Sequence, residues 1–282
     1  MYDLNGKIAI VTGAGGRHGI GRAIATRLAS EGANVVVTDV PQSLDAIRAE
    51  DRQQGWEGLN SVAAEIEAMG RESLALFSDV SDSDQVDDMV GQALAKFGRI
   101  DILVNNAGSR PGKDRVLVVE LEEEAFDEVM RVNVRGTYLV SRAVARHMTA
   151  RGGGGKIINI SSGAGKRGIA RYAAYCASKF AVIGFTQAMA QEMAQHRVNV
   201  NAICPGLVDT ERVDYIAAAL APEGESSEEY RAGMIADRAV RVPMGRVAQG
   251  DDIARMAAFL ASAESDYVTG LSISVSGGSE MN

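Results

Sequence analysis

Two side chains that could move a proton lie four residues apart in the second half of the chain. Tyr175 and Lys179 fall in a segment, 172–195, whose pattern predicts a helix, so their side chains share one face. A tyrosine hydroxyl has an ordinary pKa of about 10, and an adjacent ammonium lowers that pKa because it favours the phenolate. The pair would supply an acid or base usable near neutral pH, as alcohol–carbonyl chemistry requires. The spacing alone also fits a stacked surface pair.

Length, composition and charge limit the other functions that the chain could have. Its 282 residues are 46% hydrophobic, enough for one large core, and no linker rich in proline, glycine or serine divides them. A net charge of -8 argues against general nucleic-acid binding. There is no run of about 18 apolar residues for a membrane span, and the N-terminus lacks the pattern of a signal peptide. We therefore expect a cytoplasmic protein with a small-molecule substrate and neither nucleic acid nor membrane as partner.

Cysteine and histidine are too few for a metal centre or a disulfide framework. The chain has two cysteines and three histidines, and none stands at metal-ligand spacing. Cys176 follows Tyr175 directly and could be taken for a nucleophile. No neighbouring base is apparent, so we favour a role in packing for this cysteine. The sequence predicts that no metal takes part.

Short apolar runs alternate with helical patterns from end to end. The predicted strands are 7–12, 34–39, 72–77, 102–105, 156–161, 197–203 and 271–275. The predicted helices are 20–31, 59–69, 84–97, 121–149, 172–195 and 251–262. Several strands are almost uninterrupted in apolar residues, which suits strands covered on both faces. The sequence therefore predicts an α/β fold, a single domain over 1–282 with a doubly wound parallel sheet of about seven strands and helices on both faces.

Two stretches interrupt this alternation. Segment 41–58 is longer than a usual strand-to-helix connection and holds the only tryptophan, Trp56. It could be a binding loop or a tolerated surface insertion, and the sequence does not separate the two. Segment 209–241 is long, acidic around 223–229 and partly helical in pattern. Because it follows a strand end, we expect it to be a substrate lid.

A glycine-rich turn joins the first predicted strand to a helix. From Thr12 to Gly21 the chain reads TGAGGRHGIG, and glycines at such a turn let the backbone approach a pyrophosphate. Asp39 ends the second predicted strand, where a carboxylate would bind the adenosine ribose hydroxyls and repel a 2′-phosphate. Arg17 is a contrary sign, since a basic residue in this turn could accept that phosphate. The carboxylate is better placed, so the sequence predicts NAD as cofactor, with NADP disfavoured.

With these motifs in place, the chain resembles the short-chain dehydrogenase/reductase family over nearly its full length. The family's Thr-Gly-x-x-x-Gly-x-Gly motif is matched here, but with two extra residues between its first and second glycines. The sequence therefore leaves the conformation of 15–18 open. Segment 105–108 resembles the family's Asn-Asn-Ala-Gly signature, and 205–210 its Pro-Gly segment. The resemblance implies a Rossmann fold and a cofactor site made of Gly13, Arg17, His18, Gly19, Ile20, Gly21, Asp39, Asp79, Val80, Asn106, Ala107, Gly108, Tyr175, Lys179, Pro205, Gly206, Val208 and Thr210.

The family's catalytic set of Asn, Ser, Tyr and Lys also has matches here: Asn133, Ser162, Tyr175 and Lys179. Ser162 lies thirteen residues before the tyrosine, the family's usual spacing, whereas Ser161 is one step off. The resemblance implies that Tyr175 is the base in oxidation and the acid in reduction, and that Lys179 lowers its pKa and binds the nicotinamide ribose. Ser162 would hold the substrate oxygen, and Asn133 a water that links the lysine to solvent. Tyr172 is excluded because position 176 is not a lysine.

The substrate is less well defined. Segments 109–115 and 163–171 should lie near the reacting carbon, and they carry Arg110, Lys113, Arg115, Lys166, Arg167 and Arg171. These charges could recognise an anionic or heavily hydroxylated substrate, such as a sugar acid, a sulfonated sugar or a polyol. They could equally be solvated loop charges or subunit contacts. The candidate substrate residues are Arg110, Gly163, Lys166, Arg171 and Leu207.

Taken together, the residues and the resemblance predict an NAD-dependent oxidoreductase acting on the CH–OH group of a sugar, a polyol or another small polar or anionic alcohol. One alternative is an NADPH-dependent 3-oxoacyl thioester reductase, against which Asp39 argues. Another is a catalytically silent NAD-binding regulatory protein, which the complete catalytic set disfavours. The resemblance further implies a homotetramer or homodimer formed through 121–149, 172–195 and 267–278.

Overall fold

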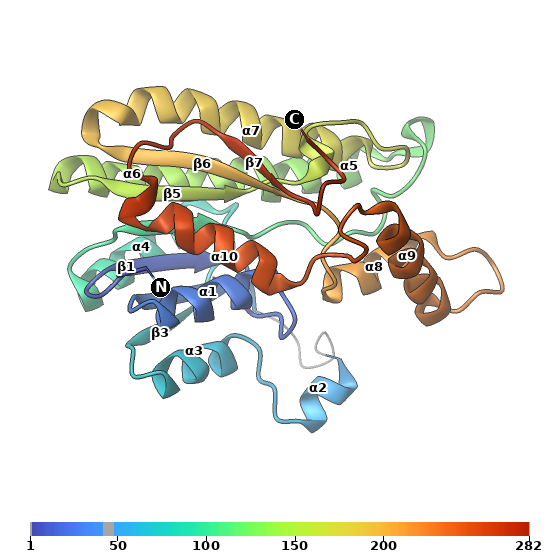
Figure 1. Ribbon diagram of the computed structural model, residues 1–282, viewed down its shortest axis with the longest axis horizontal. Helices are drawn as coiled ribbons and strands as arrows, with labels where there is room; N and C mark the ends of the chain where they lie inside the picture. The colour runs from blue at the N-terminus through green and yellow to red at the C-terminus, as the bar shows by residue number, and fades with distance from the viewer. Residues whose placement is uncertain (1, 42–47, 282) are drawn as a thin grey trace.

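All seven apolar runs pair as parallel strands of one sheet, in the order β3-β2-β1-β4-β5-β6-β7. The computed structural model describes residues 2–41 and 48–281, and Figure 1 shows the sheet with helices on both sides. The strands are β1 (Ile8–Thr12), β2 (Asn34–Asp39), β3 (Ser73–Phe77), β4 (Ile102–Asn105), β5 (Gly155–Ile160), β6 (Val198–Pro205) and β7 (Ser272–Val275). Each lies within two residues of its predicted bounds, and the predicted doubly wound α/β fold is confirmed.

The strands are apolar on both sides because helices cover both faces of the sheet. One face packs against α1 (Ile20–Ser30), α3 (Leu59–Ala68) and α10 (Gly250–Ala261). The other packs against α4 (Ser83–Phe97), α6 (Thr137–Arg151) and α7 (Ala173–Met193). The inner strands are consequently shielded from water on both faces. Among the described residues, no helix has the length and apolar character needed to cross a membrane.

The turn after β1 brings the chain unusually close to the segment after β4. Gly13 has φ of 65°, and a Cβ there would lie 2.7 Å from the Cα of Ala107. A Cβ on Gly21 would lie 2.3 Å from the carbonyl oxygen of Gly13, so the first turn of α1 also requires glycine. The side-chain amide of Asn106 ties the two segments by donating to the carbonyls of Thr12 and Gly13, at 2.9 and 2.8 Å. At this place the strand order reverses direction, and a crevice opens there at the carboxyl ends of the strands.

The helix predicted over 121–149 is present but is not α-helical throughout. It consists of α5 (Glu123–Met130), one π-helical stretch (Arg131–Gly136) and then α6. Gly136 lies against Val80, where a Cβ would come within 2.7 Å of a valine methyl group. The extra residue in the turn rotates Asn133 inward, where it is 1% exposed. Hydrophobic periodicity did not reveal this irregular turn.

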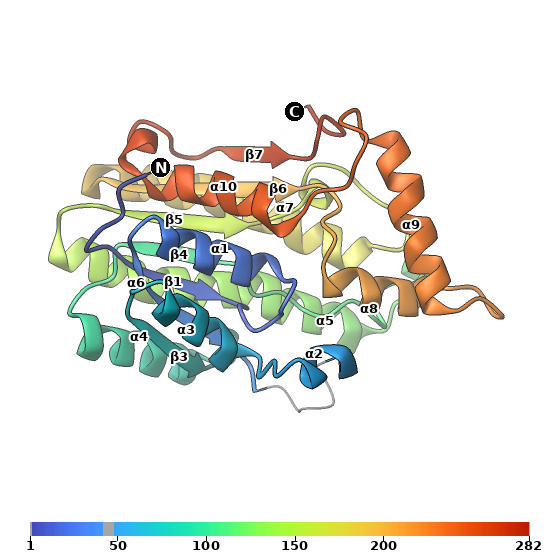
Figure 2. The same ribbon diagram turned by 60° about the horizontal axis from the view of Figure 1, so that its bottom comes forward.

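The segment predicted as a lid forms two helices beyond the carboxyl ends of the strands. These are α8 (Glu211–Leu220) and α9 (Ser227–Arg241), and Figure 2 shows them side by side at one end of the sheet. Arg231 of α9 is ion-paired with Asp209, at 2.5 Å, and with Asp214 of α8. Ser226 and Glu229 form a capping box at the start of α9. No residue of α9 is fully buried, so this helix is the most loosely packed of the long helices.

Candidate active site

A cavity of about 1110 Å³ lies at the carboxyl ends of the strands, beneath α8 and α9. It is larger than a site for one drug-sized molecule, which occupies about 300–1,000 Å³. It therefore has room for a dinucleotide together with a small substrate. The predicted site residues that line it are Gly13, Gly19, Ile20, Asp39, Asp79, Val80, Asn106, Ala107, Gly108, Arg110, Ser162, Gly163, Tyr175, Lys179, Pro205, Gly206, Leu207, Val208 and Thr210.

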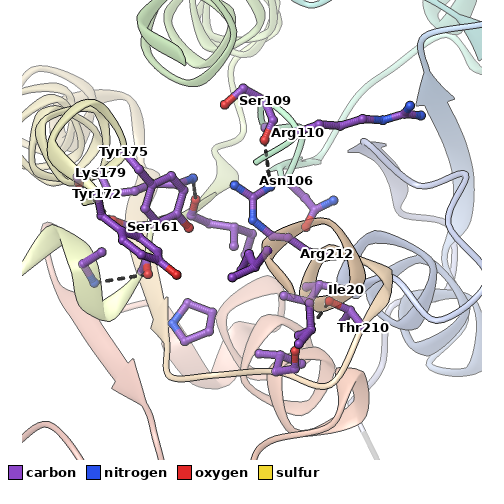
Figure 3. A pocket seen from close by; sticks show the side chains of 18 of the residues that line it. Ile20, Asn106, Ser109, Arg110, Ser161, Tyr172, Tyr175, Lys179, Thr210 and Arg212 are labelled. Atoms are coloured by element: carbon purple, nitrogen blue, oxygen red, sulfur yellow. Dashed lines mark hydrogen bonds between the residues drawn. The ribbon is translucent and has the colours of Figure 1, made fainter. Parts of the chain in front are cut away.

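Tyr175 and Lys179 project from the first turns of α7 into this cavity, as Figure 3 shows. The ammonium of Lys179 donates to the carbonyl of Ile160, at 2.8 Å, and lies 5.7 Å from the centre of the tyrosine ring. Burial alone would raise the pKa of Tyr175, but the charges of Arg212 and Lys179 outweigh it, and the net shift is downward. Burial also lowers the pKa of Lys179. The site thus holds a tyrosine whose phenolate is stabilised by nearby cations.

The hydroxyl groups of the neighbouring Ser161 and Ser162, and of Tyr172 and Tyr175, have different surroundings. Ser161 donates its hydroxyl to the backbone carbonyl of Lys179, at 2.9 Å, and so fixes α7 against β5. Ser162 instead forms a side-chain hydrogen bond with Tyr175, which helps to lower the pKa of that tyrosine. In contrast, burial raises the pKa of Tyr172. Of the two serines and two tyrosines, Ser162 and Tyr175 are thus the pair suited to proton transfer.

Asn133 connects the reacting helix to the segment after β4. Its side-chain oxygen accepts from the backbone N–H of Ser109, at 2.8 Å, and its amide donates to Ser178, at 2.9 Å. The Ser178 hydroxyl donates in turn to the backbone carbonyl of Tyr175, at 2.8 Å. The side chain of Asn133 therefore holds three elements in register around the tyrosine.

Comparison with known proteins agrees with this geometry. A family model described as short chain dehydrogenase matches residues 7–221. The chain belongs to the short-chain dehydrogenase/reductase family. As a member of that family it is an oxidoreductase acting on CH–OH groups.

Curated relatives in the family match almost the whole chain. The sorbitol dehydrogenase of Cereibacter sphaeroides is 40% identical, over 99% of each chain, and the galactitol 2-dehydrogenase of Agrobacterium fabrum is also 40% identical, over 99% of each. The 2-dehydro-3-deoxy-D-gluconate 5-dehydrogenase of Escherichia coli is 36% identical, over 98% of this chain and 96% of the relative. A 3-oxoacyl-[acyl-carrier-protein] reductase of Haemophilus influenzae is less similar, at 34%. These names span neutral polyols, a sugar acid and a thioester.

A solved short-chain dehydrogenase supports the fold. The structure of NAD+-bound xylitol dehydrogenase superposes with a TM-score of 0.81, at 31% identity, over 98% of this chain and 99% of the other.

Within residues 2–41 and 48–281 no group of histidine, cysteine and acidic side chains is placed to hold a metal ion.

The two departures from the short-chain dehydrogenase pattern contact each other. The indole N–H of Trp56, in the extra segment 41–58, donates to the carbonyl of Gly15, at 3.2 Å, in the lengthened glycine turn. Asp51, in the short helix α2 (Ala49–Gln53) of the same segment, pairs with Arg17 at 3.0 Å. The extra segment therefore holds the extended turn in one conformation. Positions 42–47 of the predicted insertion lie outside the described residues.

This contact changes the predicted roles of the turn residues. Arg17 and His18 do not line the cavity, because Asp51 lies 3.0 Å from the guanidinium and 3.7 Å from the imidazole. The backbone N–H of His18 donates instead to Glu211 of α8, at 2.5 Å. Gly21 does not line it either, and its role is the close packing already described. Asp39 remains in the cavity, where its carboxylate accepts from the N–H of Gly15, at 2.8 Å.

Two of the five candidate substrate residues are not brought to the cavity. Lys166 is turned toward β7, where its ammonium donates to the Ser272 carbonyl at 2.7 Å and to Ser274 at 2.9 Å. Arg171 is exposed in the turn before α7, where its φ is 66°, and it does not line the cavity. Arg110 lines the cavity but stacks on Tyr215 of α8, 5.3 Å from the ring centre. Sequence position alone could not show these orientations.

The cavity also contains residues that the sequence did not single out as site residues. The side chain of Arg212 reaches across it to the carbonyl of Ser109, at 2.9 Å (Figure 3). Arg115, noted only as one of several loop charges, lies against Tyr175. The α9 wall and the C-terminal segment supply further residues, among them Met234, Asp237, Arg238, Arg241 and Glu280. A signal for Arg212 was present, since it comes two residues after Thr210.

We expect Trp56→Phe to loosen the glycine turn. The substitution keeps an aromatic ring in the buried site but removes the indole N–H that donates to the Gly15 carbonyl. Loss of one such hydrogen bond costs about 0.5–1.5 kcal/mol of the free energy of unfolding. Chemical denaturation should show this loss, and amide hydrogen exchange at 14–19 should be faster. Glu57→Gln, an exposed neighbour, is the control, and equal exchange in both variants would contradict the role of Trp56.

Proposed function

We propose that the protein is an NAD-dependent dehydrogenase that oxidises a secondary alcohol of a sugar, polyol or sugar acid, and reduces the carbonyl product in reverse. The observation that carries this proposal is the Tyr175 hydroxyl, hydrogen-bonded to Ser162 beside a buried lysine, in a cavity with room for a cofactor and a small substrate. The names of the relatives, which act on sorbitol, galactitol and a deoxygluconate, support the substrate class.

The cofactor end of the cavity fits a dinucleotide. A Cβ on Gly13, in the turn after β1, would clash with Ala107, so the position is restricted to glycine, and a glycine turn lets the backbone approach a pyrophosphate. Asp39, at the end of β2, presents a carboxylate to the ribose position, and it would repel a 2′-phosphate. Arg17, the residue that could have favoured NADP, is held by Asp51. We therefore propose NAD in preference to NADP, in keeping with the NAD+-bound xylitol dehydrogenase of similar fold.

Each catalytic residue has a distinct task in this proposal. A bound nicotinamide would accept or supply the hydride. Tyr175 would remove the hydroxyl proton in oxidation and return it in reduction, with Lys179 stabilising the phenolate. Ser162 would hold the substrate oxygen and stabilise charge that develops on it. Asn133 would keep the tyrosine, the lysine and the segment after β4 aligned, and we retain the proposal that a water at this residue connects the lysine to solvent.

Two other functions are less well supported. A thioester reductase of the NADPH-dependent type would need a site for a 2′-phosphate, and Asp39 occupies that position. A silent binding protein would have no use for a tyrosine with a lowered pKa, which is typical of a catalytic group.

We further propose that the protein assembles as a homotetramer or homodimer in the cytoplasm. Large apolar side chains remain exposed along the outer side of the α5–α7 layer and at the β7 edge: Val119, Phe126, Tyr138, Phe180, Tyr267 and Leu271. Such patches mark interaction surfaces. Both cysteines are free and buried, as suits a reducing compartment. Light scattering should give a mass of two or four chains, and a monomer at micromolar concentration would contradict this proposal.

Tyr175→Phe should remove turnover and leave cofactor binding intact, because it deletes only the hydroxyl. General acid–base catalysis contributes about 10²–10⁴-fold to the rate. The test follows NADH formation from NAD+ with sorbitol, galactitol, aldonates and other polyols, and NADP+ serves as the competing cofactor. Tyr2→Phe, whose ring lies beside Phe259 of α10 and outside the cavity, is the matched control and should retain turnover. Unchanged oxidation by Tyr175→Phe would refute the mechanism, and faster turnover with NADP+ would refute the cofactor assignment.

The pH profile should depend on Lys179. The phenolate is the active form in oxidation, so kcat/KM falls as the pH drops through the pKa of Tyr175, which lies below its ordinary value. Lys179→Met removes a cation that lowers this pKa, so the acid limb should move to higher pH. Lys113→Met, an exposed lysine on the loop after β4, should leave the limb in place. A limb that stays fixed in Lys179→Met, or moves to lower pH, would count against this role.

A further inference from the structure

Two guanidinium groups flank the reacting tyrosine from opposite segments. The guanidinium carbon of Arg115, on the loop after β4, lies 4.8 Å from the ring centre of Tyr175 and 4.2 Å from that of Tyr172. The corresponding carbon of Arg212, at the start of α8, lies 5.1 Å from the ring centre of Tyr175. Both arginines line the cavity. Together with Lys179, three cationic side chains therefore lie around the ring of Tyr175.

Arg115 is buried to a degree that is rare for an arginine. The residue is 2% exposed and ion-paired with the adjacent carboxylate of Asp114 through one terminal nitrogen. Its Nε is buried without a hydrogen-bond partner within the described part of the chain. A guanidinium has five N–H donors, and burying a charge is costly unless its donors are satisfied. The side chain is thus held in the cavity wall with donor capacity to spare.

Arg212 also has spare capacity. Its side chain donates to a neutral acceptor, the carbonyl of Ser109, and among residues 2–41 and 48–281 it forms no ion pair. Its neighbour on α8, Glu211, is directed to the glycine turn instead. Within the same described ranges, Asp114 is therefore the only carboxylate that is ion-paired with either guanidinium. This leaves a local excess of positive charge in a protein whose net charge is -8.

We propose that Arg115 and Arg212 form a binding site for a carboxylate of the alcohol substrate, so that the preferred substrate is a sugar acid and not the corresponding neutral polyol. The planar fork of a guanidinium matches the two oxygens of a carboxylate. Because both groups lie close to the Tyr175 ring, the carboxylate binds near the reacting carbinol. The buried arginine gives a fixed contact, and the arginine on α8 closes over the substrate with the lid. This inference rests on the proposed dehydrogenase function and specifies its substrate class.

The two arginines also stabilise the phenolate of Tyr175, and the test must separate that effect from substrate binding. A change in the pKa of the tyrosine alters the oxidation of every alcohol alike. A lost contact to a carboxylate alters only the oxidation of acids. The ratio of kcat/KM for an acid to that for its neutral counterpart therefore reports the binding site alone.

The experiment compares D-gluconate with sorbitol, and D-galactonate with galactitol, at saturating NAD+. In each pair the acid and the polyol differ only in a terminal carboxylate or hydroxymethyl group. We expect the wild-type enzyme to favour the acid of at least one pair by about tenfold or more, and Arg212→Gln to reduce that ratio by about 10–100-fold, as for loss of a charged hydrogen bond. Arg115→Lys keeps the buried charge but removes the fork, and it should also reduce the ratio. Arg146→Gln, an exposed arginine on α6, should preserve it.

Folding of each variant is checked by its thermal transition and by NAD+ binding. A wild-type ratio of one or less in both pairs, or an unchanged ratio in both Arg212→Gln and Arg115→Lys, would overturn the carboxylate site while leaving a polyol dehydrogenase in place. Absence of NADH formation with all four compounds, despite NAD+ binding, would overturn the proposed function and this inference with it. The two failures are thus distinguishable.

Discussion

The site depends on keeping a protonated lysine buried next to a tyrosine. Burial disfavours the charged form of Lys179, and the protein offsets this with the carbonyl of Ile160 at the end of β5 and with the phenol itself. That arrangement requires α7 to lie tightly against the sheet, which the hydrogen bond from Ser161 to the backbone of Lys179 secures. The same packing places the Tyr175 hydroxyl against Ser162. The packing of α7 on the sheet therefore sets both the position of the Tyr175 hydroxyl and the charges around it.

The glycine turn after β1 is longer than the family motif, and a second segment, 41–58, contacts it. Two extra residues would leave 15–18 without the contacts of a shorter turn, and segment 41–58 supplies replacements through Trp56 and Asp51. The ion pair with Asp51 also keeps Arg17, the basic side chain of this turn, away from the cavity. In our proposal, cofactor preference therefore depends on this segment as well as on Asp39.

Charge is unevenly distributed in this acidic protein. Salt bridges satisfy some of the cations that line the cavity, such as those of Arg131 with Asp79 and Arg167 with Glu280. Around Tyr175 the balance is different, since Arg212 meets a neutral carbonyl and Arg115 has an unused donor. A cluster of this kind lowers the pKa of the tyrosine and attracts anions at the same time. In our proposal, catalysis and substrate preference are therefore linked, because both depend on the same positive potential.

From the sequence alone we could predict the sheet, the order of its elements and a set of site residues, most of which line the cavity. These follow from local patterns: apolar runs such as Ile8–Thr12, glycines that permit close approach, and fixed spacings such as that from Ser162 to Tyr175. Tertiary structure decided where long, flexible side chains point. Lys166 turned toward β7, Arg17 toward Asp51, and Arg115 and Arg212 toward the tyrosine. The direction of each side chain depends on partners that are distant in the chain. A charged group pairs with whichever group the fold brings within reach, and residue spacing along the sequence does not reveal that neighbour.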